Sequence, residues 1–437
     1  MKIKQLKLKN FRGFEGEHSV VFHDRLPTVI IGVNASGKTT VVHALFQLLS
    51  FQIFRMFPVS GENASYSGTD VSVGKEKCSL SIDYYYSENR GLKKGHLGTG
   101  FSRLQGKIPY IEKTPDSFNE HIKNILYGKD ENLLPVFLYF PAIRNTAIEE
   151  FSELNEKKYG RDKRLNIFRR IYQDTIDISR LTDWYIEQEN IQNRERVRLK
   201  DLSYSSPRFS SIMRGVLSFL NIFLGENSKL NLGEDEEGAQ TIFVNKSGKN
   251  IEFEQLSAGE KMIFGLVFEI SYRMSIANPK TENPLLAEGI VLIDELELHL
   301  HPKWQANVLN ALHETFPNVQ FIATTHSPLV INNLKKEQLI VVDDAKIIQG
   351  DKIANVYGKN ADWIIEYLMG APTRPKEIEE RISIIWSYLD DENLHIDKAK
   401  KKLAELRQII DPNDSELLEI DTVITLEETG DEIFSQR

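Results

Sequence analysis

Hydrophobic residues alternate with polar ones at the start of the chain and form short, mostly unbroken runs further on. Residues 2–9 alternate charged and apolar side chains, which is typical of a strand with one buried face. Residues 27–32, 135–140, 289–294 and 319–325 are mostly apolar runs, which indicate strands buried on both faces. Because helical patterns follow several of these runs, the chain is predicted to build an α/β sheet domain.

A long helical segment interrupts the strand patterns. From residue 148 to about residue 225 the chain is helical in pattern and densely charged, and strand patterns resume at residues 240–245. We therefore expect a helical lobe inserted between two halves of one sheet domain. The expected organisation is an N-terminal half (1–147), the inserted lobe (148–225), a C-terminal half (226–350) and a C-terminal helical region with an acidic tail (351–437).

The C-terminal region is predicted to contain a helical hairpin. Apolar residues recur at helical spacing on two segments joined by "DDEN". The first set is Ile378, Ile382, Ile385 and Leu389, and the second is Ile396, Ala399, Leu403 and Leu406. The acidic tail beyond them also carries apolar residues, so it is either a solvated tail or a docking segment.

Composition narrows the class of protein. The 437 residues are 41 % hydrophobic and 27 % charged, as in ordinary globular proteins. The net charge of −9 argues against a protein that coats nucleic acid over its whole surface. Cys78 is the single cysteine, which indicates a reducing compartment. No apolar run reaches the roughly 20 residues that a bilayer span requires. We expect a cytoplasmic protein without a membrane partner.

The segment "GVNASGKTT" (32–40) has the pattern of a phosphate-binding loop, and it follows a buried strand and opens a helix. Backbone N–H groups of such a loop converge on phosphates, while Lys38 adds positive charge at the β- and γ-phosphates. Thr39 would place its hydroxyl on Mg²⁺. The predicted ATP-binding residues here are Gly32, Asn34, Ala35, Ser36, Gly37, Lys38, Thr39 and Thr40.

Two other buried strands end in residues that suit phosphate chemistry. "GIVLIDE" ends in Asp294, a candidate Mg²⁺ ligand, and Glu295, whose carboxylate can accept a hydrogen bond from an attacking water. "FIATTHSP" places His326 at the end of the next strand, where imidazole can reach a γ-phosphate. The alternatives are a strand that ends in solvated acids and a histidine with a purely structural role.

A fourth segment, "QLSAGEKMIF" (255–264), lies far along the chain from the phosphate loop. Ser257, Ala258 and Gly259 are small and open an apolar helix, so they suit an anion-binding helix start. The alternative is an amphipathic helix whose serine is simply its cap.

The segments "GVNASGKTT", "LSAGE", "VLIDE" and "TTHSP", in this order, resemble the ATP-binding cassette class of ATPase, and its RecF-like and SMC-like branch most closely. The resemblance implies an ATPase head in which Lys38, Glu295 and His326 are catalytic. It also implies that Ser257 and Gly259 bind the γ-phosphate of a second subunit, so that two ATP molecules lie between head-to-tail subunits. The start "LKLKNFRGF" is similar to that branch too, which implies that Phe11 and Arg12 lie near the base.

Longer segments are similar to a narrower bacterial group. "DELELHLHPKWQ", "PVFLYFPAIRN" and "YGKNADWIIEYLMGAPTRP" resemble Septu-type and retron-associated anti-phage ATPases, which are related to the ATPase half of overcoming-lysogenization-defect nucleases. The sequence has neither a D-x-D after the histidine motif nor an H-N-H constellation, so we expect any nuclease to be a partner. The resemblance alone implies that this partner effector is an HNH-type nuclease. It places His299 and His301 in a loop at the dimer seam, with metal ligation as the alternative. A glutamine loop is not clear, and Arg144 stands near its expected place.

Basic residues are concentrated in the lobe and leave two interpretations open. They are Lys157, Lys158, Arg161, Lys163, Arg164, Arg169, Arg170, Arg194, Arg196, Arg198 and Lys200. They suit contact with a DNA or RNA backbone, but interspersed glutamates also suit a solvated helical face. Contact with DNA would make the protein a RecF-like DNA-repair ATPase, which is the first alternative function. The second alternative is the ATPase engine of a membrane transporter. The "LHLHP" loop and the lobe argue against the transporter.

Overall fold

The computed structural model describes most of the chain and forms two compact units. The described residues are 1–56, 66–88, 91–103, 106–111, 117–128, 132–142, 145–147, 163–168, 171–172, 175–234, 236, 238, 240–246, 248–390 and 395–434. The first unit is Met1–Ile364 and the second is Ile365–Arg437.

A six-stranded sheet forms the centre of the first unit. Its order is β16 (Lys346–Gln349), β15 (Leu339–Asp343), β3 (Thr28–Ile31), β14 (Val319–Thr324), β13 (Gly289–Ile293) and β7 (Val136–Phe140). Neighbouring strands are parallel, except for the antiparallel pair of β15 and β16. The four predicted apolar runs are β3, β7, β13 and β14, and each is buried along its whole length. The predicted α/β class is confirmed.

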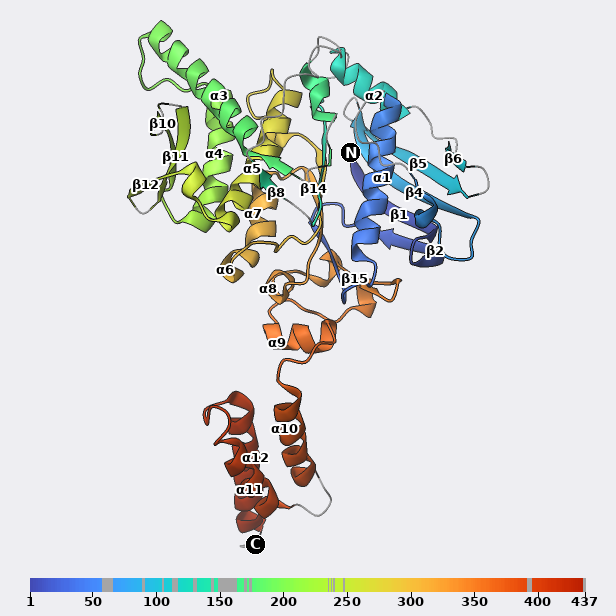
Figure 1. Cartoon of the computed structure of the whole chain (residues 1–437), viewed down its shortest axis with the longest axis vertical. Helices are drawn as coiled ribbons and strands as arrows, with labels where there is room; N and C mark the ends of the chain where they lie inside the picture. Colours follow the sequence, from blue (N-terminus) through green and yellow to red (C-terminus); the bar gives the residue numbers. More distant parts are fainter. Residues whose placement is uncertain are drawn as a thin grey trace. The chain divides into compact units, whose positions relative to one another are not determined.

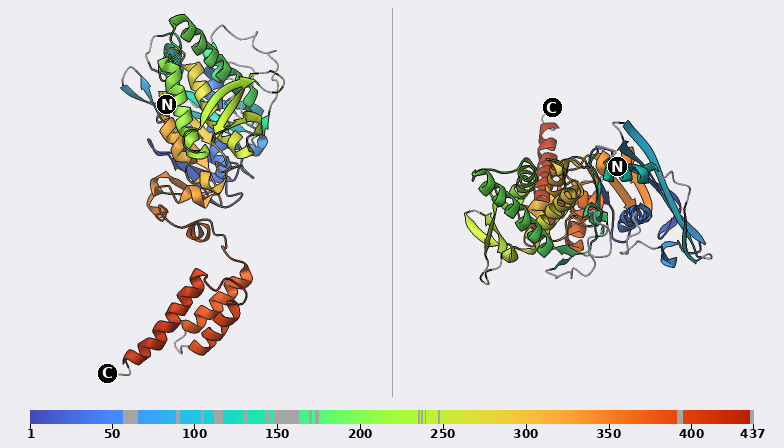
Figure 2. Two further views of the ribbon diagram at one scale, coloured as in Figure 1. Left: turned by 90° about the vertical axis from the view of Figure 1, so that its left-hand side faces the viewer. Right: turned by 90° about the horizontal axis from the view of Figure 1, so that it is seen from above.

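Helix α1 (Lys38–Met56) packs between this sheet and an antiparallel one. The second sheet has the order β2 (Phe14–Val21), β1 (Lys2–Phe11), β4 (Lys77–Glu88), β5 (Gly91–Ser102) and β6 (Gly106–Ile111). On one side α1 contacts β4 and β5, and on the other β13 and β14 (Figures 1 and 2). Contact on both sides explains why it is apolar around most of its circumference, with buried Val41, Val42, Ala44, Leu45, Leu48 and Leu49.

Helices cover the other face of the parallel sheet. Helix α5 (Ala258–Ala277) contacts β7, α3 (Ile178–Leu199) and α4 (Pro207–Leu224). Helix α4 also contacts α7 (Val308–Thr315). Figure 1 shows these helices on the side of β14 that is opposite to α1. The phosphate-loop helix and the helix after Ser257 therefore lie on opposite faces of one sheet.

Shorter elements complete the first unit. The three-stranded sheet of β10 (Lys229–Glu234), β11 (Gln240–Lys246) and β12 (Lys249–Glu252) contacts α3 through β11. The remaining strands and α-helices are β8 (Asn145–Ala147), β9 (Thr175–Asp177), α2 (Ser117–Leu126), α6 (Pro302–Gln305), α8 (Pro328–Ile331) and α9 (Ala361–Trp363). Short 3₁₀ turns are η1 (Gly68–Asp70), η3 (Lys163–Phe168), η4 (Phe253–Gln255), η5 (Pro284–Leu286), η6 (Lys336–Gln338) and η7 (Gly350–Lys352).

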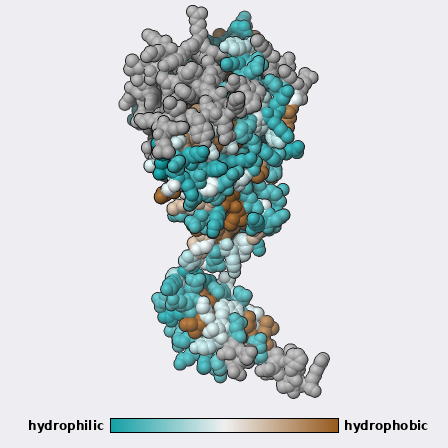
Figure 3. All heavy atoms as spheres, turned by 90° about the vertical axis from the view of Figure 1, so that its right-hand side faces the viewer, coloured by the Kyte–Doolittle hydropathy of each residue, from teal (hydrophilic) through white to brown (hydrophobic). Residues whose placement is uncertain are grey.

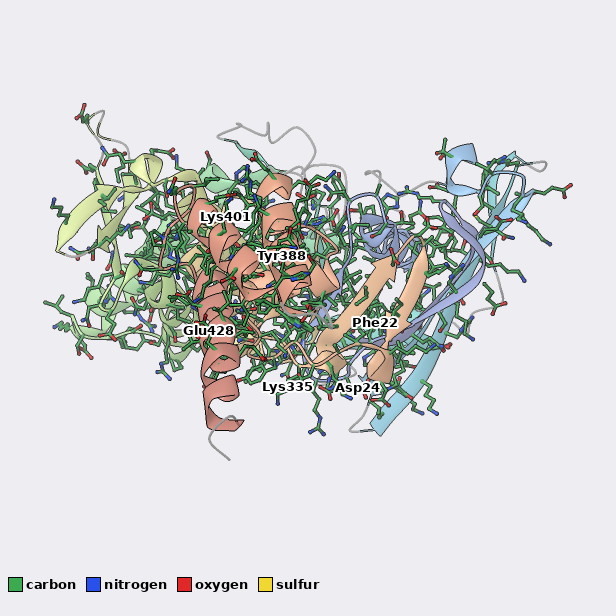
Figure 4. All side chains as sticks on the ribbon, turned by 90° about the horizontal axis from the view of Figure 1, so that it is seen from below. Phe22, Asp24, Lys335, Tyr388, Lys401 and Glu428 are labelled. Atoms are coloured by element: carbon green, nitrogen blue, oxygen red, sulfur yellow. The ribbon has the colours of Figure 1, made fainter. Side chains whose placement is uncertain are left out.

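The second unit is a small helical bundle that follows the π-helical turn Ile364–Leu368. Helices α10 (Lys376–Leu389) and α11 (Ile396–Leu406) pack together as the predicted hairpin, and α12 (Ser415–Phe434) adds a third helix. Figure 4 labels one residue on each helix, namely Tyr388, Lys401 and Glu428. The buried core includes Ile382, Ile385, Leu403, Leu417, Ile420 and Ile424. Several apolar residues of the predicted docking tail therefore face the core of their own unit.

The face of the protein drawn in Figure 3 is mainly polar where it is coloured. In Figure 3, hydrophilic residues dominate the coloured surface and hydrophobic residues form only small patches. Within the described part of the chain, no helix combines the length and the apolar content that a membrane crossing requires.

A buried charge network fixes α5 to the elements beside it. Glu269 accepts hydrogen bonds from Arg273 Nε and Arg180 Nη2, both at 2.7 Å. Arg273 also donates to the carbonyl of Ile167 on η3 at 2.5 Å, and Arg180 lies over the ring of Tyr272. Burial alone would raise the pKa of Glu269, but the two arginines outweigh it and lower that pKa. The network thus joins α5 to α3 and η3.

Replacing Glu269 by alanine should lower the free energy of unfolding by about 3–5 kcal/mol, because Arg273 would remain buried without its carboxylate. Since the folded-state pKa is depressed, this contribution is present above the ordinary glutamate pKa and is lost as pH falls through the folded value. Urea unfolding at several pH values measures both effects. The control is Glu337→Ala on an exposed turn, and equal stability of the Glu269 variant and the wild type would contradict the expectation.

Candidate functional site

The phosphate loop connects β3 to α1 and has a tightly constrained backbone. Gly32 has φ of +151°, and a Cβ there would lie 2.0 Å from the carbonyl oxygen of Val342 on β15. Gly37 has φ of +114°, and a Cβ there would lie 3.0 Å from the ring of Phe14. Both positions require glycine, for their backbone conformation and for the close approach of their neighbours. Asn34 and Ala35 are exposed at the tip of the loop.

Lys38 is held over the loop that precedes it. Its Nζ donates to the carbonyl oxygens of Gly32 at 3.0 Å and Val33 at 2.9 Å, and the residue is almost fully buried. Burial lowers the pKa of Lys38, while Asp294 and Glu295 act in the opposite direction. The ammonium therefore lies inside the loop, where a phosphate would replace neutral carbonyl partners with charged ones.

Thr39 and Asp294 meet although they are far apart in the sequence. Thr39 Oγ1 donates to Asp294 Oδ1 at 3.2 Å, and Thr324 Oγ1 donates to the same oxygen at 2.5 Å. Asp294 is 1 % exposed and its backbone N–H donates to Phe140 at the end of β7. The start of α1 and the ends of three parallel strands thus converge on one buried carboxylate.

Glu295 follows in a backbone conformation that is rare for a residue with a side chain. Its φ is +50°, and its N–H donates to Thr324 Oγ1 at 2.8 Å. The chain therefore turns sharply after β13 and leaves Glu295 half-buried beside Asp294. Such strained positions are common at functional sites.

His326 lies at the end of β14, and its backbone is held by an acid that the sequence analysis did not identify. Glu297 Oε1 accepts the N–H of His326 at 2.5 Å, and Glu297 Oε2 accepts the hydroxyl of Thr325 at 2.7 Å. Burial and, to a smaller degree, Lys38 lower the pKa of His326, and Glu297 opposes them. Burial thus favours the neutral form of the imidazole. The sequence signal for Glu297 is the second acid of "ELE", which also suits a solvated side chain.

Ser257 is the N-cap of α5. Its backbone N–H donates to Glu260 Oε2 at 2.9 Å and its hydroxyl oxygen accepts the N–H of Glu260 at 3.4 Å, which forms a capping box. The hydroxyl also donates to Glu260 Oε2 at 2.7 Å. Lys246 Nζ donates to the other oxygen of Glu260 at 2.6 Å. Burial opposes the ionisation of Glu260, but Lys246 and Ser257 lower its pKa overall. Ser257 itself is exposed, so this helix start faces solvent.

Gly259 joins this helix start to the loop after Glu295. A Cβ at Gly259 would lie 2.6 Å from the carbonyl oxygen of His299, which has φ of +64°. His301 caps α6, since its Nδ1 accepts the N–H of Lys303 at 3.3 Å. Across the described residues, no group of three or more His, Cys, Asp or Glu side chains is arranged to hold a metal ion.

Phe11, which is predicted to lie near the base, is part of the core. Its ring is fully buried, because the register of β1 shifts between Lys9 and Phe11 and turns the ring into the core. Arg12 has φ of +51° and its Nε donates to Asp70 Oδ1 at 2.9 Å, so it is tied to the loop before β4. Arg144 lies outside the described residues.

Part of the predicted basic surface is occupied by internal contacts. On α3, Arg198 pairs with Glu195 at 2.5 Å, and Arg196 Nη1 lies 3.6 Å from Glu189. On η3, Arg164 donates to the carbonyl of Leu126. Lys157, Lys158, Arg161, Arg169 and Arg170 lie outside the described residues.

Comparisons with known proteins agree with this geometry. A family model described as "AAA domain, putative AbiEii toxin, Type IV TA system" matches residues 28–332. The chain is 24 % identical to "Retron Ec83 probable ATPase" of Escherichia coli, with 96 % of this chain and 86 % of that protein covered. It is 26 % identical to "Septu protein PtuA" of Bacillus thuringiensis, with 90 % of each covered. The predicted resemblance to retron-associated and Septu-type proteins is confirmed.

Among solved structures, an SMC head bound to the C-terminal winged-helix domain of ScpA matches with a TM-score of 0.46 and 16 % identity, over 80 % of this chain and 98 % of that one. The family match covers more than half of the chain and includes the phosphate loop, Ser257, Asp294, Glu295 and His326. The protein therefore belongs to this AAA-domain family and is a P-loop ATPase.

Proposed function

We propose that the protein is the ATP-hydrolysing subunit of a cytoplasmic bacterial anti-phage defence complex. In this proposal it forms head-to-tail ATP-sandwich dimers that gate a partner effector, an HNH-type nuclease. The observation that carries the enzymatic part is the convergence of Thr39, Asp294 and Glu295 at the end of β13. The retron and Septu relatives support the defence role.

The residues around Asp294 fit Mg²⁺. This cation prefers oxygen ligands and retains several waters, and the structure offers the Thr39 hydroxyl and the Asp294 carboxylate 3.2 Å apart. Bound there, Mg²⁺ would neutralise charge on the β- and γ-phosphates. The hydroxyl of Thr324 already fixes the orientation of Asp294, so this site requires little rearrangement.

The side chains at this edge of the sheet have different roles in hydrolysis. The N–H groups of the loop, with Lys38 inside it, bind the phosphates and stabilise the charge of the transferring group. Glu295 accepts a hydrogen bond from the attacking water and aligns it with the γ-phosphorus. His326, held neutral by burial, donates a hydrogen bond to the γ-phosphate from the end of β14.

The position of α5 supports the proposal of a second subunit. This helix lies on the opposite face of the sheet from α1 (Figure 1). Its start is exposed at Ser257. Ser257 is therefore poorly placed to reach the phosphate loop of its own chain. An arriving γ-phosphate would compete with Glu260 for the Ser257 hydroxyl, and Lys246 balances the charge of Glu260 there. The proposal is that Ser257 and Gly259 complete the ATP site of a partner subunit.

Direct nucleic-acid binding by the lobe has weaker support. Arg196 and Arg198 already pair with glutamates on α3, which reduces the charge available to a phosphate backbone. The RecF-like alternative therefore gains no specific support from the described residues.

Replacing Glu295 by glutamine should lower kcat for ATP hydrolysis by about 10²–10⁴-fold, because the amide is a poor acceptor for the water proton. ATP binding should persist, and ATP should now hold more of the protein as dimers. A phosphate-release assay and light scattering measure the two effects. Glu337→Gln is the matched surface control, and wild-type turnover by the Glu295 variant would show that the catalytic assignment is wrong.

Mixing two inactive variants tests sharing of the site between subunits. Ser257→Arg and Lys38→Ala should each abolish hydrolysis, but a mixed dimer contains one site with an intact loop and an intact helix start. A mixture in equal amounts should recover roughly a quarter of the wild-type rate if the two sites act independently. Circular dichroism confirms that each variant is folded. A mixture as inactive as its components would exclude sites completed in trans.

Co-purification tests the effector. The tagged protein, expressed with its genomic neighbours and purified with ATP, should elute with a stoichiometric nuclease subunit that cleaves DNA only in the complex. Dimers that elute alone and carry DNA would contradict the gated-effector proposal and favour the RecF-like alternative.

A further inference from the structure

Glu297 connects the two strand ends that carry Glu295 and His326. It lies on the segment after β13, where the N–H of Leu296 donates to Thr324 at 2.9 Å. From there its carboxylate reaches the turn after β14, and both of its oxygens accept hydrogen bonds from that turn. The side chain is half-buried, so solvent competes only partly for these oxygens.

The backbone of the turn after β14 needs hydrogen-bond acceptors from outside the sheet. The N–H of Thr325 still donates to β3, at Ile30, but the N–H of His326 lies beyond the ladder and donates to Glu297 instead. The hydroxyl of Thr325 donates to Glu297 and accepts the N–H of Ser327 at 3.0 Å. The Glu297 carboxylate therefore fixes the backbone that carries the His326 imidazole.

A second contact ties the same turn to the same segment. Ser327 Oγ donates to Gln305 Oε1 at 2.6 Å, and Gln305 Nε2 donates to the carbonyl of Leu300 at 2.9 Å. The segment 297–305 thus holds the turn at two points. Of the two side chains, Glu297 is the charged one and contacts His326 directly.

We propose that Glu297 is a positioning residue for ATP hydrolysis, which holds the main chain of His326 in register with Glu295 and does not itself touch the nucleotide. The inference rests on the proposed function above. Its physical basis is that Glu295 and His326 leave different strands, so a fixed distance between them requires a bridge between the two strand ends. Glu297 provides this bridge with two hydrogen bonds to a charged acceptor, which are stronger than neutral ones.

Two substitutions at this position separate positioning from other roles. Glu297→Ala removes both hydrogen bonds. Glu297→Gln keeps an oxygen for the N–H of His326, and its amide N–H can donate to the hydroxyl of Thr325. We expect the alanine variant to lose on the order of 10- to 100-fold in kcat while KM for ATP changes by less than about threefold. The glutamine variant should recover most of kcat. Glu337→Ala, on the exposed turn η6, is the matched control.

Three outcomes would overturn the proposal. The first is wild-type kcat in Glu297→Ala. The second is a glutamine variant as inactive as Glu295→Gln, which would place the Glu297 carboxylate at the reacting atoms. The third is a parallel loss of kcat, ATP affinity and melting temperature in both variants, which would show a merely structural role.

Hydrogen exchange separates failure of this inference from failure of the proposed function. Amides of residues 323–327 should exchange faster in Glu297→Ala than in the wild type, with α1 unchanged, whether or not ATP is hydrolysed. A wild-type protein that hydrolyses no ATP would refute the proposed function, and the exchange rates would still test the bridge. Unchanged exchange at residues 323–327 would refute the bridge alone.

Discussion

The hydrogen bonds that converge on Asp294 are the interaction on which the rest of the site depends. A carboxylate that is 1 % exposed requires partners, and here the hydroxyls of Thr39 and Thr324 provide them. These partners come from the start of α1 and from a neighbouring strand. The parallel register, with Ile293 beside Ala323 and Thr324 beside Ile30, brings the strand ends to one edge of the sheet. The register of the sheet therefore brings the partners of Asp294 together, and their hydrogen bonds to Asp294 in turn connect the strand ends.

The segment after β13 connects this centre to the other motifs. Glu295 and His299 both have positive φ, so the chain turns twice within a few residues and stays close to the sheet edge. In this path it places Glu297 against His326 and the carbonyl of His299 against Gly259. A short loop thus contacts the helix start at Ser257 on one side and the histidine turn on the other.

Much of the fold was predictable because its strands are buried on both faces. Such strands appear in sequence as unbroken apolar runs, and β3, β7, β13 and β14 fall within the predicted ranges. The hairpin of α10 and α11 was predictable for a similar reason, since its apolar residues repeat at helical spacing. The burial of Phe11 was not predictable, because it depends on a register shift that periodicity does not show. The tail was ambiguous because α12 carries both acidic and apolar residues, and only packing shows that Leu417 and Ile420 are buried.

The sequence by itself determined the type of chemistry. Its signals are local patterns, which can be recognised without knowledge of the fold. They are the glycine spacing of residues 32–37, the lysine and threonine after it, and the acids and histidine at strand ends. Tertiary structure alone decided which groups each acid contacts. Glu295 and Glu297 are two residues apart, but the left-handed turn at Glu295 directs Glu297 to a backbone N–H that lies on another strand. Contacts of this kind depend on strand order and register, and the spacing of residues along the chain determines neither of them.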